Sequence, residues 1–335
     1  MFNTFDESQT AQLSREIHAL IEVDCEAICK IQGAWHKDNT IGLIIEFMDL
    51  GSLDFLLADD FAHAQLPERV LAAMTYQILW GLCYLHYSKT MHRDIKPANI
   101  LLSSDGEVKL SDFGISSMLN ETSTMADTSV GTFRYMSPER LLGERYGPTA
   151  DVWSLGLALM ELQLRHYPFD RCHSSIDLIA ELEVVHFHEF LATFCRRGSS
   201  CLGEKGKDEK EGEAIFSPLL ADFLASMLAT DPAARASSEA LLHDSEWLAT
   251  MLGCGEDGLE NARGVVRAWV EDIGLGSGTS DGDLGASLGW REKERNGARG
   301  RKECIAEQTE DDTGDYDDDL FERPFREDEE KYNRK

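Results

Sequence analysis

Two short strings of polar residues lie close together in the sequence and limit how the chain between them can fold. The first is HRDIKPAN at residues 92–99, and the second is SDFG at residues 111–114. Residues 99–110 form two short apolar runs around the turn sequence SSDG, a pattern typical of a β-hairpin. Because a hairpin returns the chain on itself, we expect Asn99 and Asp112, one at each end, to converge.

The residue types in these strings suit the transfer of a phosphoryl group. That reaction needs an acceptor hydroxyl aimed at the phosphate and cations that bind the phosphate oxygens. Asp94 can orient the hydroxyl and accept its proton, and Lys96 can neutralise charge on the transferred group. Asn99 and Asp112 supply oxygen ligands, which Mg²⁺ prefers. The alternative is that Asp94 and Asp112 are ordinary turn residues, but the two strings at this spacing favour the catalytic interpretation.

Composition narrows the class of protein. The chain has 335 residues and a formal net charge of −29, so its overall field does not attract nucleic acid or anionic lipid. No apolar run reaches the roughly 18 residues of a membrane span, and the first residues lack the pattern of a signal peptide. The eight cysteines form no CxxC pair, which indicates reduced thiols. We therefore expect a cytoplasmic protein with no nucleic-acid or membrane partner.

The hydrophobic pattern predicts a mostly helical body with a few strands, an α+β fold. Residues 41–49 are a short apolar run that predicts a buried strand. Helices are expected at 8–22, from residue 52, and at 67–85, 149–164, 176–191, 217–229, 237–249 and 261–275. The Gly-rich, charged stretch 195–213 predicts a solvated insertion, and the acidic residues beyond 275 predict disorder.

Two further motifs follow HRDIKPAN and SDFG in the sequence: GTFRYMSPER at 131–140 and DVWSLGL at 151–157. Together, the four motifs resemble those of a eukaryotic protein kinase. The strings GSLD (51–54) and VGTFRYMSPERL are more specific and are similar to the MAP kinase kinases. The resemblance covers roughly residues 1–250. It implies a protein kinase fold with a remnant of the small lobe at 1–48, a large lobe at 49–250 and a tail at 251–335.

The resemblance also implies an activity and its partners. MAP kinase kinases transfer the γ-phosphate of ATP, with Mg²⁺, to Ser/Thr and Tyr residues of a downstream MAP kinase. They are themselves activated by an upstream MAP kinase kinase kinase.

Further site residues follow only from alignment with this family. The expected nucleotide-binding residues are Ile45, Glu46, Met48, Ser52, Lys96, Ala98, Asn99, Leu101 and Asp112. Structural roles are expected for Arg93, Phe113 and Thr132 in the catalytic region, for an ion pair of Glu139 with Arg235, and for Asp151 as an anchor of the catalytic loop. Glu16 occupies the position of the glutamate that pairs with the family's strand lysine.

The segment between SDFG and SPE is rich in hydroxyl side chains. By resemblance, the regulatory phosphorylation sites are Thr122, Thr124 and Thr128, of which Thr128 fits both spacings found in the family. A phosphate there can dock on Arg93 and order the loop. The alternative is that these hydroxyls are ordinary loop-forming residues.

No GxGxxG motif and no lysine precede Glu16, although the family has both. Three explanations stay open: a sequence truncated relative to its protein, which the retained catalytic residue types favour; a non-catalytic pseudokinase or scaffold that binds other cascade kinases; and a shortened active kinase. We expect little phosphotransfer from this chain, because contacts to the phosphates would be lost. Residues 261–275 are either part of a solvated tail or a docking helix for an upstream kinase.

Overall fold

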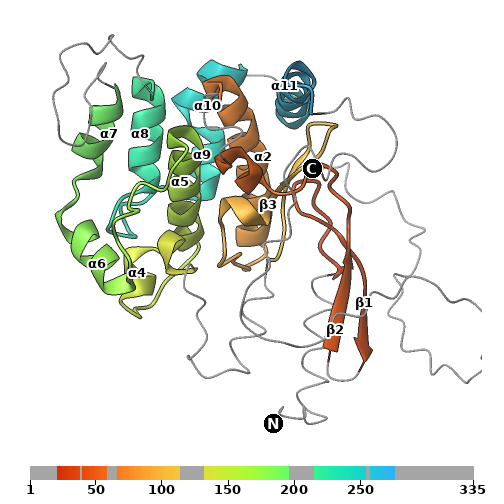
Figure 1. Cartoon of the computed structure of the whole chain (residues 1–335), viewed down its shortest axis with the longest axis horizontal. Coiled ribbons are helices and arrows are strands. Elements are labelled where there is room, and N and C mark those ends of the chain that lie inside the picture. Colours follow the sequence, from red (N-terminus) through yellow and green to blue (C-terminus); the bar gives the residue numbers. More distant parts are fainter. Residues whose placement is uncertain are drawn as a thin grey trace, which may run out of the picture.

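In the computed structural model of the protein, the described residues are 21–37, 40–58, 66–113, 132–195, 215–253 and 257–275. Figure 1 shows most of the helices gathered on one side, with the β1–β2 hairpin on the other. The helices are α2 (Glu68–Tyr87), α4 (Pro138–Leu141), α5 (Thr149–Leu164), α6 (Ser175–Val184), α7 (Phe187–Cys195), α8 (Pro218–Met227), α9 (Ser238–His243), α10 (Glu246–Leu252) and α11 (Gly258–Asp272). Three 3₁₀ turns add to them: η1 (Leu53–Leu57), η3 (Pro97–Asn99) and η4 (Thr132–Tyr135).

Helix α5 lies at the centre of the helical part. Every residue from Ala150 to Leu164 is buried, as the all-round apolar sequence predicts. The indole of Trp153 is fully buried and meets the ring of Phe187 edge to face, with centroids 5.4 Å apart. Helices α2 and α8 pack against α5, so α5 is the central helix of the body.

Two separate antiparallel hairpins supply the strands. β1 (Ile31–Lys37) pairs with β2 (Thr40–Ile45), and the register shifts between Ile31 and Gly33. β3 (Ile100–Leu102) pairs with β4 (Val108–Leu110), which confirms the hairpin predicted from the turn SSDG. The fold therefore combines a helical body with few strands, in agreement with the α+β expectation.

A second, smaller hydrophobic cluster joins the β1–β2 hairpin to the helical body. Its buried members are Ile21, Cys25, Ala27, Ile28, Ile31, Ala34, Leu85 and Phe113. The segment before β1 also bonds to β4 through its backbone: Cys29 N–H donates to Leu110 O at 2.8 Å, and Leu110 N–H donates to Ala27 O at 2.9 Å. Apolar packing and backbone pairing thus both fix this junction.

Two helix predictions were wrong in extent. The stretch 176–191 is not one helix, because α6 ends where Val185 takes an extended backbone and α7 starts at Phe187. The stretch 237–249 also divides, since Ser245 caps α10 by accepting a hydrogen bond from Leu248 N–H. Ser and Asp side chains form hydrogen bonds with the backbone and therefore favour helix ends. The pair Asp244–Ser245 indicates the break between α9 and α10, although the apolar periodicity continues across it.

The strand predicted at 41–49 is shorter and less buried than expected, because β2 ends at Ile45 and the side chains of Ile44 and Ile45 are about half exposed. The helix expected from residue 52 is the 3₁₀ turn η1. Most of the helix expected at 8–22 and all but Cys195 of the insertion predicted at 195–213 lie outside the described residues. Among the described residues, no helix is both long enough and apolar enough to cross a membrane.

The turn between β3 and β4 is fastened to α2 by one buried side chain. Gln77 donates from Nε2 to Gly106 O at 3.1 Å and accepts from Val108 N–H with Oε1 at 3.0 Å. The side chain of Gln77 therefore satisfies two backbone groups where the chain turns toward Asp112. An apolar residue at this position leaves both groups without a partner.

We predict that Gln77→Leu lowers the free energy of unfolding by about 2–5 kcal/mol, because two buried backbone groups lose their hydrogen bonds. Thr75→Val is the matched control on the same helix. The Thr75 hydroxyl is also buried but donates only to Leu71 O, so we expect a cost of about 1 kcal/mol. Urea unfolding of both variants checks this, and equal costs would contradict the role of Gln77.

Candidate active site

The β3–β4 hairpin places the ends of the two polar strings side by side. Ser111 N–H donates to Asn99 O at 2.9 Å, and the Ser111 hydroxyl reaches the same oxygen at 3.3 Å. Asn99 ends η3 directly before β3, and Asp112 follows β4 by one residue. The convergence expected from the sequence is present in the structure.

Two side chains of the first string, those of Lys96 and Asn99, contact the Asp94 carboxylate. Lys96 Nζ lies 2.7 Å from Asp94 Oδ2, and Asn99 Nδ2 lies 2.8 Å from the same oxygen. Asn99 Nδ2 also donates to Asp94 O at 2.7 Å. Among the described residues no hydrogen bond is made to Asp94 Oδ1. The carboxylate is therefore fixed through one oxygen, while the other can accept a proton.

The backbone is strained at one residue in each of the two polar strings. Arg93 has φ 71° and Asp112 has φ 59°, in the left-handed region that non-glycine residues rarely adopt. Such residues cost about 1–3 kcal/mol each and persist only where their surroundings hold them. Here the holding contacts for Arg93 are visible in the structure.

A buried carboxylate from α5 holds the segment that carries Asp94. Asp151 Oδ2 accepts from His92 N–H at 2.9 Å, and Oδ1 accepts from Arg93 N–H at 2.8 Å. His86 Nε2 lies 3.0 Å from Asp151 Oδ2, and His86 Nδ1 lies 2.9 Å from the Ser238 hydroxyl. The role expected for Asp151, anchoring this loop, matches these contacts.

Burial by itself raises the pKa of Asp151, but its hydrogen bonds oppose this effect. The contacts from His86 and from the Arg93 amide outweigh burial and lower the pKa of this carboxyl below its ordinary value. Burial lowers the pKa of His92 against the nearby carboxylates, so His92 is neutral at pH 7. The buried carboxylate of Asp151 is consequently ionised at pH 7.

The oxygen atoms of Asn99 and Asp112 suit a Mg²⁺ ion that is also bound by substrate phosphates. Both amide hydrogens of Asn99 are directed at Asp94, which leaves Oδ1 as its coordinating atom, and Asp112 is exposed. Within the described ranges, no group of three or more His, Cys, Asp or Glu side chains could hold a metal ion by itself. Mg²⁺ commonly takes one or two protein oxygens and completes its shell with water and substrate phosphates.

The residues expected around the nucleotide base lie near the junction of the hairpins. A small cavity is lined by Cys29, Ile31, Ile45, Ser111, Asp112 and Phe113, so Ile45 and Asp112 share one hollow. Ser52 forms an isolated backbone bridge with Leu101. Met48 is buried, whereas Ala98 is exposed. Glu46 N–H is taken by Lys30 O at 2.8 Å, so only the carbonyl of Glu46 is left for a base.

Sequence reasoning missed a buried lysine beside this cavity. Lys109 on β4 is 5% exposed, and its Nζ lies 2.5 Å from Glu46 Oε1 and 3.3 Å from Glu107 Oε2. Partial burial alone would raise the pKa of Glu46, but hydrogen bonds from Lys109 and the Lys30 amide lower it. The signal in the sequence was a lysine between the apolar residues of a predicted strand.

Cys29 was also missed. Its thiol lies 3.4 Å from Glu46 O, and burial, reinforced by the negative charge of Glu46, raises its pKa to about 11. A thiol with so high a pKa stays protonated at pH 7 and is a poor nucleophile. Cys29 therefore contributes as a small apolar residue in the wall of the cavity.

An ion pair joins helix α4, which contains Pro138 and Glu139 of the SPE triplet, to the rest of the helical body. Arg235 Nη1 lies 2.8 Å from Glu139 Oε1, and Nη2 lies 3.0 Å from Oε2. The Arg235 side chain is fully buried and also donates to Ala229 O and Thr149 O. Burial opposes ionisation of Glu139, but the Arg235 hydrogen bonds lower its pKa below the ordinary value. The structure thus joins the two residues that the resemblance paired.

The other expected site residues differ in whether the structure describes them. Glu16, Thr122, Thr124 and Thr128 lie outside the described residues. Thr132 starts η4, and only its backbone is described. Phe113 is 3% exposed and packs in the smaller hydrophobic cluster.

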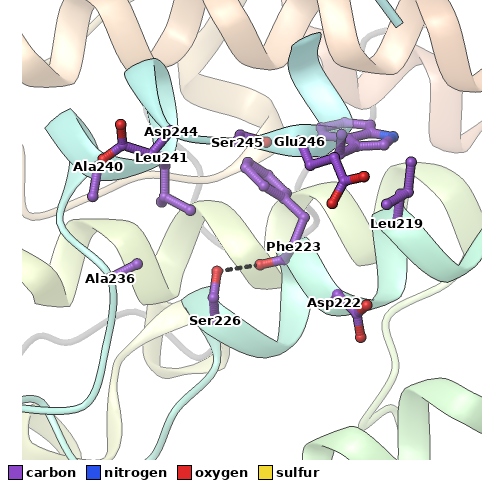
Figure 2. A pocket seen from close by; sticks show the side chains of 11 residues that line it. Leu219, Asp222, Phe223, Ser226, Ala236, Ala240, Leu241, Asp244, Ser245 and Glu246 are labelled. Atoms are coloured by element: carbon purple, nitrogen blue, oxygen red, sulfur yellow. Dashed lines mark hydrogen bonds between the residues drawn. The ribbon is translucent and has the colours of Figure 1, made fainter. Parts of the chain in front are cut away.

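A second hollow lies in the helical body, away from these residues. Figure 2 shows it between α8 and the α9–α10 segment, with the carboxylates of Asp222, Asp244 and Glu246 at its edge. None of the residues expected in a catalytic or binding role lines it. The candidate active site is therefore the region around Asp94, Asn99 and Asp112.

Comparison with known proteins identifies the family of this chain. The family described as "Protein kinase domain" matches residues 3–248. Relatives include "Mitogen-activated protein kinase kinase 1" of Arabidopsis thaliana, 33% identical over 223 residues, which are 63% of this chain and 62% of that protein. "Mitogen-activated protein kinase kinase SIPKK" of Nicotiana tabacum is 36% identical over 224 residues, with the same shares of 63% and 62%.

A third relative is an animal protein. "Dual specificity mitogen-activated protein kinase kinase dSOR1" of Drosophila melanogaster is 43% identical over 158 residues, 47% of this chain and 39% of that protein. The chain spans about three-fifths of the length of the plant relatives it matches.

We predict that Arg235→Met lowers the free energy of unfolding by about 3–5 kcal/mol, because Glu139 stays buried without its partner. Lys30→Met is the control. Lys30 pairs with Asp24 at 2.9 Å, but both side chains are well exposed, so we expect a cost of at most about 1 kcal/mol. Urea unfolding measures both values, and a small cost for Arg235→Met would contradict the importance of the buried pair.

A second prediction concerns how the stability contributed by Asp151 depends on pH. Asp151 has a folded-state pKa below its ordinary value of 3.8, so its stabilisation is present above that pH and is lost as pH falls through the folded-state pKa. We expect Asp151→Asn to cost about 1–3 kcal/mol at pH 7. The stability difference between the wild type and this variant should shrink below about pH 4, measured by urea unfolding at several pH values. A difference independent of pH would contradict the assignment.

Proposed function

Because this chain belongs to the protein kinase family and is of the MAP kinase kinase type, we propose that its protein transfers the γ-phosphate of ATP to Ser/Thr and Tyr residues of a MAP kinase. The names of the relatives indicate the class of enzyme. The chain's own residues supply the reason to assign catalysis to this site.

The observation that carries the proposal is the arrangement at Asp94. Lys96 and Asn99 both bind Oδ2, so the carboxylate is oriented while Oδ1 stays available for the hydroxyl of a substrate. Asp94 then acts as the base that orients this hydroxyl and takes its proton. Lys96, at 2.7 Å from Asp94, is placed to balance negative charge on the transferred group.

ATP and Mg²⁺ are the cofactors that this reaction uses. Asn99 and Asp112 would hold the metal through oxygen atoms, and the bound ion would neutralise phosphate charge. Together with Lys96, Asn99 and Asp112, the proposed contacts of the nucleotide are Ile45, Glu46, Met48, Ser52, Ala98 and Leu101. The Glu46 carbonyl is the proposed acceptor for the base, since its amide is already bonded to Lys30 O.

The proposed partners are a MAP kinase as substrate and an upstream kinase as activator, in the cytoplasm. Phosphorylation at Thr122, Thr124 or Thr128, with Arg93 as the docking cation, stays a prediction, as does a docking role for 261–275. Val266 and Val270 on that helix are buried, so a docking partner would meet its polar face.

We predict that Asp94→Asn lowers phosphate transfer at least about 100-fold, because the base and the orientation of the hydroxyl are both lost. Because we expect only slow transfer from this chain, the full chain is incubated at high concentration and for long times with MgATP and a catalytically inactive MAP kinase. Phosphate on the Thr and Tyr residues of that MAP kinase is then counted by mass spectrometry. Asp244→Asn, an exposed carboxylate at the end of α9, is the control and should keep wild-type activity.

Two outcomes would contradict the proposal. Transfer that survives Asp94→Asn would show that another group, or a contaminating kinase, is responsible. A wild-type chain that transfers no phosphate but still binds the MAP kinase would favour the non-catalytic scaffold.

A further inference from the structure

Helix α11 follows the region that matches the kinase family, which ends at residue 248, yet it is packed into the body of the protein. Ala262, Val266 and Val270 are fully buried, and Figure 1 shows α11 beside α2 and the β3–β4 hairpin. At Gly106, which has φ +81°, an added Cβ would lie 2.3 Å from the backbone oxygen of Arg263. Backbone therefore meets backbone where α11 crosses the turn that precedes β4.

Arg263 on this helix bridges two carboxylates from distant parts of the chain. Its Nη2 lies 2.7 Å from Glu26 Oε2 and 3.6 Å from Glu107 Oε1. The Arg263 side chain is only 15% exposed, which separates it from ordinary surface cations. Glu26 precedes the segment that bonds to Leu110, and Glu107 directly precedes β4, so the guanidinium spans both sides of this strand junction.

The line of alternating charge continues toward the nucleotide-binding segment. Glu107 Oε2 lies 3.3 Å from Lys109 Nζ, which in turn lies 2.5 Å from Glu46 Oε1. The other oxygen of Glu46 accepts from Lys30 N–H at 3.2 Å. Arg263 is thus joined, through Glu107 and the buried Lys109, to Glu46, whose carbonyl is a proposed base contact.

We propose that Arg263 is a positioning residue through which α11 braces the strand leading to Asp112 and the segment carrying Glu46. The part of this inference that concerns nucleotide rests on the proposed function. The brace itself rests only on the ion pairs and on the backbone bonds between 27–29 and Leu110. Without Arg263, Glu26 and Glu107 lose their common cation, and the junction is held by the backbone bonds and apolar packing alone.

The brace is tested by hydrogen exchange on the full-length chain with Arg263→Gln. We expect faster exchange of the Cys29 and Leu110 amides, whose bonds join the two segments, while the amides of α5 and α8 keep wild-type rates. Glu260→Gln on the same helix is the control, because Glu260 is 63% exposed and lies 3.7 Å from Arg263 Nη1 without joining the bridge. Arg263→Lys keeps the charge and should restore part of the protection.

A second variant separates the bridge from a general loss of folding. Glu26→Gln changes an exposed carboxylate, so the protein keeps its fold, and it should speed the same exchange to a smaller degree. Because both residues act through one contact, the double variant Glu26→Gln with Arg263→Gln should exchange no faster than Arg263→Gln alone.

The consequence for nucleotide is measured by titration with a fluorescent ATP analogue and Mg²⁺. Arg263→Gln should weaken binding about threefold to tenfold, and in a transfer assay it should raise KM for ATP while leaving kcat within about twofold. Unchanged exchange at Cys29 and Leu110 would overturn the brace, and so would a uniform rise that includes α5. Faster exchange with unchanged affinity would overturn the link to nucleotide, whereas a wild-type chain that binds no nucleotide would instead count against the proposed function.

Discussion

The carboxylate of Asp151 is the contact on which the candidate site depends. It lies at the start of a fully buried helix and receives the backbone amides of His92 and Arg93, so the strained conformation at Arg93 is supported from the interior. Its hydrogen bonds with these amides and with His86 keep it ionised despite burial. The position of Asp94, one residue further along, follows from this anchor.

Two further charged contacts extend the support outward. The buried pair Glu139–Arg235 fixes α4 to the body, and Arg235 also lies over the Trp153 ring, 5.1 Å from its centroid. On the other side, Lys109 joins β4 to Glu46, and Arg263 adds a helix from beyond the matched family region. In each case a cation satisfies carboxylates from separate segments, and removal of one partner leaves a charge unpaired.

Local sequence predicted the parts of this arrangement that depend on neighbours in the chain. The hairpin around SSDG, the buried helix at 149–164 and the return of the chain that bonds Ser111 to Asn99 all followed from turn residues, apolar pattern and spacing. The breaks at Val185 and Asp244–Ser245 did not, because apolar periodicity continues across them while capping decides where each helix ends. The Lys109–Glu46 and Arg263–Glu26 contacts join residues 63 and 237 positions apart, and no local pattern reports such pairs.

The central claim is that a buried carboxylate holds the Asp94 segment in place before any substrate binds. The most direct measurement is the native-state exchange rate of the His92 and Arg93 amides on the chain without nucleotide. If Asp151 binds them as described, both amides exchange as slowly as those in the middle of α5, with protection close to the global free energy of unfolding. Exchange at the rate of solvent-exposed amides that make no hydrogen bond would contradict the claim.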